Sequence, residues 1–192
     1  MTKREEAIKR KQLAELASRP LSYVSKHPTE FFSTFGSTIK FLSETKGSDI
    51  TLSDDELLVS KTKMSENESF VAVNRPLNGT ISLTLTSTFF DGTFCSCIGY
   101  VDPDSAQTAE VYKSLTGVIA SRTDVVFLIN GVEQEKSGIK LHSNDAIIAV
   151  FENDKTIFKT SLSDWTVVVE NVQGKVFGIA VAADAESWRL SW

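Results

Sequence analysis

Residues 81–86, ISLTLT, alternate apolar and polar side chains, as a strand does when one face is buried and the other meets water. Three short apolar blocks follow at 125–129 (VVFLI), 146–151 (AIIAVF) and 176–181 (VFGIAV), each bounded by Asn, Asp or Gly. No long helical pattern interrupts residues 50–192. The sequence therefore predicts an all-β fold, an antiparallel β-sandwich.

Turn signals divide this region into short strands. Asn78-Gly79 is expected to form a hairpin turn, because Gly tolerates a positive φ, and residues 131–138 are interpreted as a hairpin tip. The irregular stretch 102–110 is the longest loop candidate, and long loops on a rigid sandwich often carry recognition. We expect strands near residues 50–52, 56–61, 69–73, 80–87, 93–100, 117–120, 124–129, 145–151, 155–160, 165–169, 175–182 and 187–191.

The first part of the chain has a different pattern. Residues 3–18 are rich in helix formers, with Thr2 as a candidate N-cap and Arg19-Pro20 as a stop. We therefore divide the chain into an N-terminal helical extension, 1–45, and a sandwich domain, 46–192. The apolar stripe of the helix is narrow, so the helix either packs on the sandwich or pairs with the same helix of a second copy in a dimer.

Charge and composition exclude several classes of partner. The chain of 192 residues has a net charge of -5, which argues against nucleic acid and against an anionic membrane surface as partners. No run of about 18 apolar residues and no signal-like segment occurs, so we expect a cytoplasmic protein. Cys95 and Cys97, two apart in a strand, predict neither a disulfide nor a metal site.

The sequence offers little for catalysis. His27 and His142 have no visible acid or base partner, and Glu133 and Glu135 fall in the expected hairpin tip. Phosphate-binding loops, His-x-His pairs and nucleophile elbows are missing from the sequence. We therefore expect that the protein is not an enzyme and uses no cofactor or metal.

Several segments resemble, in order, those of SPRY (B30.2-type) domains, whose bent sandwich has a concanavalin-like architecture. They are 50–59 (ITLSDDELLV), 71–81 (VAVNRPLNGTI), 97–101 (CIGYV) and 144–150 (NDAIIAV), where Asn144 replaces the usual Gly. The resemblance covers about residues 50–191. It implies a non-catalytic, adaptor-like module that binds a peptide or protein partner through loops at one end of the sandwich.

Carried onto this sequence, the resemblance suggests Arg75, Tyr100 and Trp165 as partner-binding residues, and Asp102 opens the long loop beside Tyr100. Each of them also has a structural interpretation, in surface ion pairing or in core packing.

Two other functions remain open. A carbohydrate-binding sandwich could use Trp165 beside Asp164, or Trp188 and Trp192, although packing is the default for the last two. A structural β-domain would assemble through its sheet edges.

Overall fold

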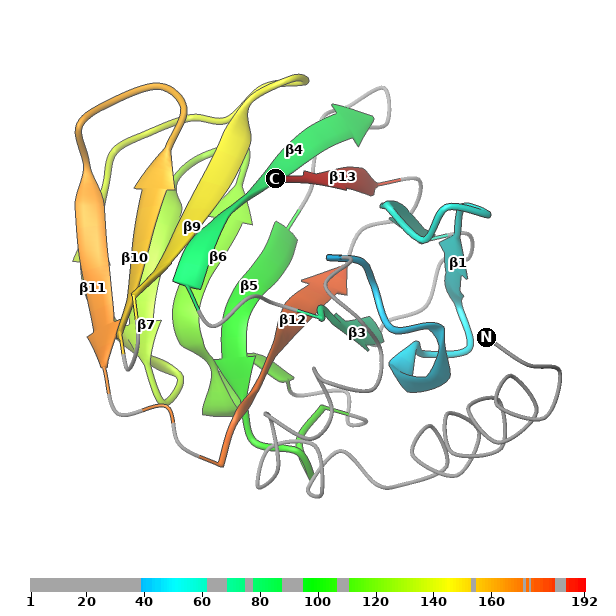
Figure 1. Cartoon of the computed structure of the whole chain (residues 1–192). Helices are drawn as coiled ribbons and strands as arrows, with labels where there is room; N and C mark the ends of the chain where they lie inside the picture. The colour runs from blue at the N-terminus through cyan, green and yellow to red at the C-terminus, as the bar shows by residue number, and fades with distance from the viewer. Residues whose placement is uncertain are drawn as a thin grey trace, which may run out of the picture.

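The computed structural model describes residues 39–61, 69–74, 78–87, 95–106, 111–152, 155–170, 172, 174–181 and 186–192. Within them the strands form two antiparallel sheets that face each other as a β-sandwich (Figure 1). The all-β prediction is confirmed. The predicted N-terminal helix lies outside the described residues.

The two sheets contain seven and six strands. In spatial order the seven-stranded sheet has β1 (Ile50–Leu52), β2 (Leu58–Lys61), β13 (Ser187–Ser191), β4 (Asn78–Ser87), β9 (Ala146–Glu152), β10 (Lys155–Thr160) and β11 (Thr166–Glu170). The six-stranded sheet has β3 (Ser69–Ala72), β12 (Val176–Val181), β5 (Cys95–Val101), β6 (Thr116–Ser121), β7 (Val125–Ile129) and β8 (Val132–Lys136). Two short 3-10 helices, η1 (Ser43–Thr45) and η2 (Val111–Ser114), accompany them.

The seven-stranded sheet is buried on one face only. Along β10 half-buried and buried residues alternate, and along β11 exposed and buried residues alternate. This is the period of two that the sequence shows in ISLTLT of β4, where Ile81, Leu83 and Leu85 are buried. The buried face packs against the six-stranded sheet, and its other face is the outside of the molecule.

The central strands β12 and β5 of the six-stranded sheet are buried on both faces, which is why β12 reads as a continuous apolar block. The inner face of the sheet joins the main core, with Phe177 stacked on Phe158 and edge-on to Phe151. Its outer face carries a second apolar cluster that includes Cys97 and Ala180. Leu42, Ala106, Val111 and Leu115, from segments outside the sheet, complete this outer cluster.

Three glycines lie in one row across the centre of the six-stranded sheet. Gly178 pairs with Gly99, and Gly99 pairs with Gly117. A Cβ at Gly117 would lie 2.3 Å from the carbonyl oxygen of Ile98, and one at Gly99 would lie 2.6 Å from that of Thr116. Gly99 also has a φ of 151°, so the strands approach here in a way that only glycine allows.

The segment before β1 belongs to the body of the sandwich. Phe41 is fully buried in the main core and forms an isolated bridge with Val73. Ile39 lies in the same core, and Leu42 in the outer cluster.

Most predicted strands are found within a few residues of their expected positions, but two turn predictions need correction. Asn78-Gly79 is not a hairpin turn: both residues lie in β4 and pair with Glu152 and Phe151 of β9. A two-residue turn needs two consecutive strands that pair with each other, whereas β3 and β4 belong to different sheets. The expected hairpin tip at 131–138 is instead largely the strand β8.

Cys97 is buried and Cys95 is half-buried.

Candidate partner-binding site

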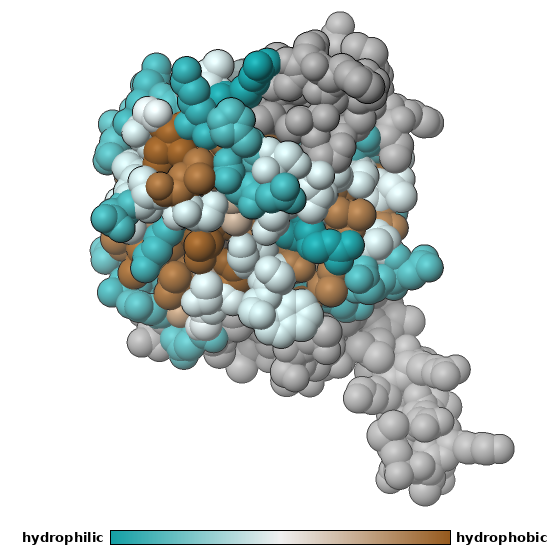
Figure 2. Space-filling view, turned by 90° about the horizontal axis from the view of Figure 1, so that it is seen from above, coloured by the Kyte–Doolittle hydropathy of each residue, from teal (hydrophilic) through white to brown (hydrophobic). Residues whose placement is uncertain are grey.

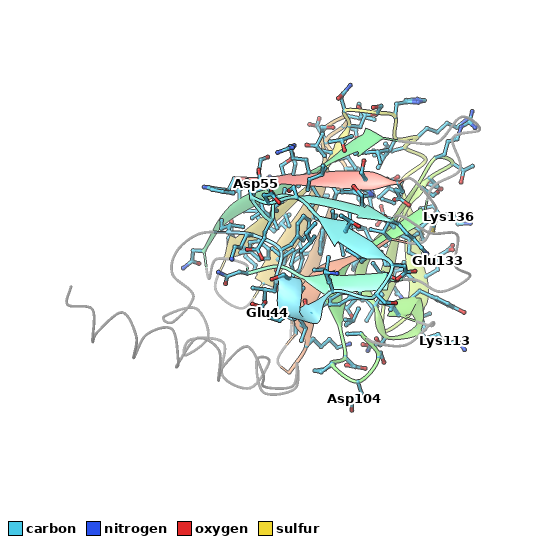
Figure 3. The ribbon with its side chains drawn as sticks, turned by 90° about the vertical axis from the view of Figure 1, so that its right-hand side faces the viewer. Glu44, Asp55, Asp104, Lys113, Glu133 and Lys136 are labelled. Atoms are coloured by element: carbon cyan, nitrogen blue, oxygen red, sulfur yellow. The ribbon has the colours of Figure 1, made fainter. Side chains whose placement is uncertain are left out.

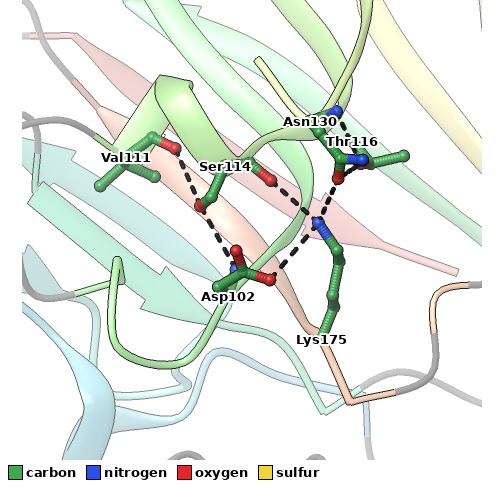
Figure 4. A network of polar contacts seen from close by, with 6 residues as sticks. All are labelled: Asp102, Val111, Ser114, Thr116, Asn130 and Lys175. Atoms are coloured by element: carbon green, nitrogen blue, oxygen red, sulfur yellow. Dashed lines mark hydrogen bonds and ion pairs between the residues drawn. The ribbon is translucent and has the colours of Figure 1, made fainter.

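A network of polar contacts centred on Lys175 lies at one end of the six-stranded sheet (Figure 4). Its ammonium group donates to Oδ1 of Asn130 at 2.7 Å and to the carbonyl oxygen of Ser114 at 3.2 Å. It also lies 3.4 Å from Oδ1 of Asp102. The Lys175 side chain is only 15% exposed and that of Asp102 is 55% exposed, so the network holds a carboxylate at the surface.

The turn between β7 and β8 brings Asn130 into this network. Ile129 pairs with Val132, and both intervening residues have positive φ, 49° for Asn130 and 74° for Gly131. That is the type I′ turn that Asn-Gly favours. The hydroxyl of Thr116 accepts a hydrogen bond from the Asn130 backbone at 3.1 Å, which fixes the turn on β6.

The same turn packs tightly on η2. The amide of Gly131 donates to the carbonyl oxygen of Leu115 at 2.8 Å. A Cβ at Gly131 would lie 2.4 Å from the carbonyl oxygen of Lys113. The loop after β5 is tied on as well, because the amide of Asp102 donates to the Ser114 hydroxyl at 3.3 Å. Hydrogen bonds therefore join these three segments at one end of the sheet.

Exposed apolar side chains occur on the segments that carry this network. Tyr112 of η2 is 39% exposed, and Ile129 and Val132 beside the turn are 44% and 61% exposed. Charged residues lie around them: Figure 3 shows Lys113 and Glu133 along one side of the molecule. We name this surface, made of Asp102, Tyr112, Ile129, Asn130, Val132 and Lys175, the Lys175 end.

The sequence-predicted residues do not all meet here. Asp102 is part of the Lys175 end, but Tyr100 is 1% exposed and points into the core. Its hydroxyl is hydrogen-bonded to that of Thr156 in the opposite sheet at 2.7 Å, and its ring packs edge-on to Phe177. As a core residue it leaves no surface for a partner, so its proposed binding role is not supported. Arg75 lies outside the described residues.

Trp165 lies toward the other end of the sandwich. Its indole nitrogen donates to Glu135, which stands near the far end of β8, because that strand runs from Val132 at the Lys175 end to Lys136. Trp165 is half-buried against the main core, while Leu162 in the preceding loop is 49% exposed. Figure 2 looks down on this second end and shows apolar patches among polar residues.

The other tryptophans differ from each other. Trp188 is fully buried, and its indole nitrogen donates to the buried carboxylate of Glu186 at 2.7 Å. Trp192, for which packing was expected, is instead 64% exposed.

Among the residues that the structure describes, no group of three or more His, Cys, Asp or Glu side chains is placed to hold a metal ion. In the same part of the chain, no helix is long and apolar enough to cross a membrane.

Solved structures identify the architecture. A human SPRY domain superposes with a TM-score of 0.55 and 16% sequence identity over 80% of this chain and 96% of that one. The PSpry domain of TRIM65 gives 0.54 and 12% over 80% and 89%, and the SPRY domain of human HERC1 gives 0.52 and 11% over 78% and 96%. The chain has a divergent SPRY fold.

No protein-family model matches the sequence, and no curated protein matches it. The SPRY fold is therefore recognised through its structure, as the order of segments in the sequence indicated. Asp102, which the sequence predicts as a partner-binding residue, lies in the Lys175 network. Asn130 could have been predicted as well, because the two residues Asn130-Gly131 separate the sequences of β7 and β8 and are a common two-residue hairpin turn.

Proposed function

We propose that this protein is a non-catalytic interaction module that binds a peptide or protein partner at the Lys175 end. The observation that carries the proposal is that exposed apolar side chains and a hydrogen-bonded polar network occur on the same segments. Tyr112, Ile129 and Val132 supply apolar area, and Asp102 and Asn130 supply hydrogen-bonding groups whose positions are set by Lys175.

The physical argument is preorganisation. Binding energy at protein interfaces concentrates in a few anchors, and aromatic residues such as Tyr are enriched among them. A surface that is already ordered loses less conformational entropy on binding. The two-residue turn, η2 and the Asp102 loop are held together by hydrogen bonds, so this end meets that condition.

The likeness to SPRY domains supports a binding module over an enzyme. We propose that the partner is met in the cytoplasm, a compartment in which thiols such as those of Cys95 and Cys97 stay reduced. We propose Trp165 as a second contact at the other end of the sandwich.

The test is an affinity capture from cytosol with the 192-residue protein as bait, compared with two double variants. Tyr112→Ala with Val132→Ser removes the apolar area of the Lys175 end. Leu162→Ser with Trp165→Phe changes the other end and is the matched control. Thermal melts of all three proteins exclude unfolding as the cause of a loss.

The expected result is one partner whose binding is saturable. The first variant should capture at least tenfold less of this partner, and the control should capture as much as the wild-type protein. Loss with the control alone would move the site to the Trp165 end. A glycan array on the same preparations tests the carbohydrate-binding alternative, for which exposed Trp192 is the available platform; a glycan signal without a protein partner would overturn the proposal.

A further inference from the structure

The strand β11 is an open edge of the seven-stranded sheet. It is the last strand in the sheet order, and among the described strands it pairs with β10 alone, from Lys155 opposite Glu170 to Lys159 opposite Thr166, without a register shift. Figure 1 shows it at the left-hand border of the molecule. In an edge strand alternate backbone N–H and C=O groups point away from the sheet and can pair with another strand.

The sequence of β11 does little to block such pairing. It reads TVVVE, with four β-branched residues, no proline and no lysine. The strand β8, at the edge of the other sheet, is different: it reads VEQEK, and its pairing with β7 shifts register between Phe127 and Leu128. Charged side chains and β-bulges prevent the edge strands of two molecules from pairing, and both features are found on β8.

The exposed face of β11 continues an apolar row. Val168 is 49% exposed and pairs with Ile157, which pairs with Val150. Ile157 and Val150 are both half-buried on the same outer face. The row therefore ends at an open edge with a large part of the Val168 side chain in water.

We propose that β11 pairs with β11 of a second copy of this chain, antiparallel and centred on Val168. This register makes the strand complementary to itself. Val168 faces Val168 of the second copy, and Val167 faces Val169 of the second copy on the core side. Each of these contacts joins two β-branched apolar residues, a favourable cross-strand pair.

The charges agree with this register. Thr166 faces Glu170 of the second copy, so the two Glu170 carboxylates lie at opposite ends of the paired strands. Because Thr166 also pairs with Lys159, the incoming Glu170 falls in the same row as a Lys159 ammonium. No like charges face each other, and the two seven-stranded sheets become one continuous sheet.

This interface lies on a different element from the Lys175 end and does not depend on the proposed partner. It also differs from a dimer formed through the N-terminal helix, which remains a separate prediction. A variant of the Lys175 end should therefore lose partner binding without losing the dimer, and a variant of β11 should lose the dimer without losing partner binding.

The sharpest test is cysteine crosslinking under a mild oxidant. In an antiparallel pair the Cα atoms of facing residues lie about 4.5–5.5 Å apart, within the range that a disulfide spans. Val168→Cys should therefore form a covalent dimer. Thr166→Cys is the matched control, because the two copies of residue 166 would be displaced by about 13 Å along the strands.

The wild-type protein, with Cys95 half-buried, gives the background of the same reaction. Rapid crosslinking of Val168→Cys, at least tenfold faster than that of Thr166→Cys, supports the proposed register. Equal rates for the two variants, or no dimer with either, would overturn it.

A second measurement uses no cysteine. Sedimentation equilibrium of the full chain should show self-association toward twice 21.1 kDa as the concentration rises. Val168→Lys places two ammonium groups opposite each other and should weaken association at least tenfold, whereas Val132→Lys on β8 should not. A dimer that survives Val168→Lys unchanged would mean that another surface, such as the N-terminal helix, carries it, and would refute the β11 interface.

Discussion

The indole nitrogen of Trp165 donates a hydrogen bond to Oε1 of Glu135 at 2.8 Å, and this contact joins the edges of the two sheets. Trp165 precedes β11 of the seven-stranded sheet, and Glu135 belongs to β8 of the six-stranded sheet. The contact thus closes the side of the sandwich where both sheets end.

Replacing Trp165 tests this closure. Trp165→Phe keeps an aromatic ring but removes the donor, and should lower the free energy of unfolding by about 0.5–1 kcal/mol, because the hydrogen bond is solvent-exposed. Urea denaturation measures the change. Glu135→Gln keeps an acceptor and should cost less; equal costs for both variants would mean that the carboxylate charge matters more than the hydrogen bond.

A second prediction concerns the bond between the sheets made by Tyr100 and Thr156. Tyr100→Phe leaves the buried Thr156 hydroxyl without this partner and should cost about 1–2 kcal/mol of unfolding free energy. Adding Thr156→Val removes the stranded hydroxyl, so the double variant should recover part of the loss. Chemical denaturation of the full double-mutant cycle gives the coupling, and strictly additive losses would argue that the two hydroxyls do not interact.

The glycine row predicts a strong steric effect. Gly117→Ala places a methyl group 2.3 Å from a backbone oxygen, so two central strands must separate, at an expected cost of about 3 kcal/mol or more. Gly174→Ala is the control, since nothing lies within 4 Å of its added Cβ and only its positive φ of 80° is unfavourable, at about 1 kcal/mol. Thermal melts would contradict this account if the two variants lost equal stability.

Acid should weaken one ion pair near the start of the sandwich. Burial opposes ionisation of Glu56, but hydrogen bonds from Lys40 and Ser43 outweigh it and lower the pKa of Glu56 below its usual 4.5. The Lys40 ammonium and the Glu56 carboxylate are in direct contact. Because the folded-state pKa is lowered, this stabilisation is present above the unfolded pKa and is lost as the pH falls through the folded one.

Glu56→Gln should therefore lose about 0.5–1 kcal/mol of unfolding free energy at pH 7 and much less at pH 3. Denaturation curves between these pH values provide the measurement. Asp54→Asn, which removes a carboxylate from the same exposed loop, is the control. A Glu56→Gln cost that stays constant with pH would show that lost packing, rather than lost charge, is responsible.

The strands were predictable where burial leaves a regular pattern of apolar residues in the sequence. β4 and β12 were found because one alternates and the other is apolar throughout. β8 was missed because all five of its residues are exposed, so no hydrophobic pattern marks it and only its hydrogen bonds to β7 make it a strand.

The candidate site was less predictable, because its residues come together only through sheet register. Asp102 could be found in a long loop, but Lys175, Asn130 and Ser114 are far apart in sequence and meet only when β5, β6, β7 and β12 align. Tyr100 shows the converse: residue type favoured an interface, while its place on the inner face of β5 put it in the core.

The burial of β5 and β12 on both faces limits which substitutions this sequence can accept over evolutionary time. A substitution in β5 or β12 must satisfy a packed layer on whichever side it points, so almost every position of those strands is under steric selection. The outer positions of β11 are exposed and those of β10 are half-buried, so a substitution there disturbs less packing within the chain. Similarity to the sequence of a distant ancestor should therefore persist longest in β5 and β12. A search for remote relatives would gain most by giving those two strands more weight.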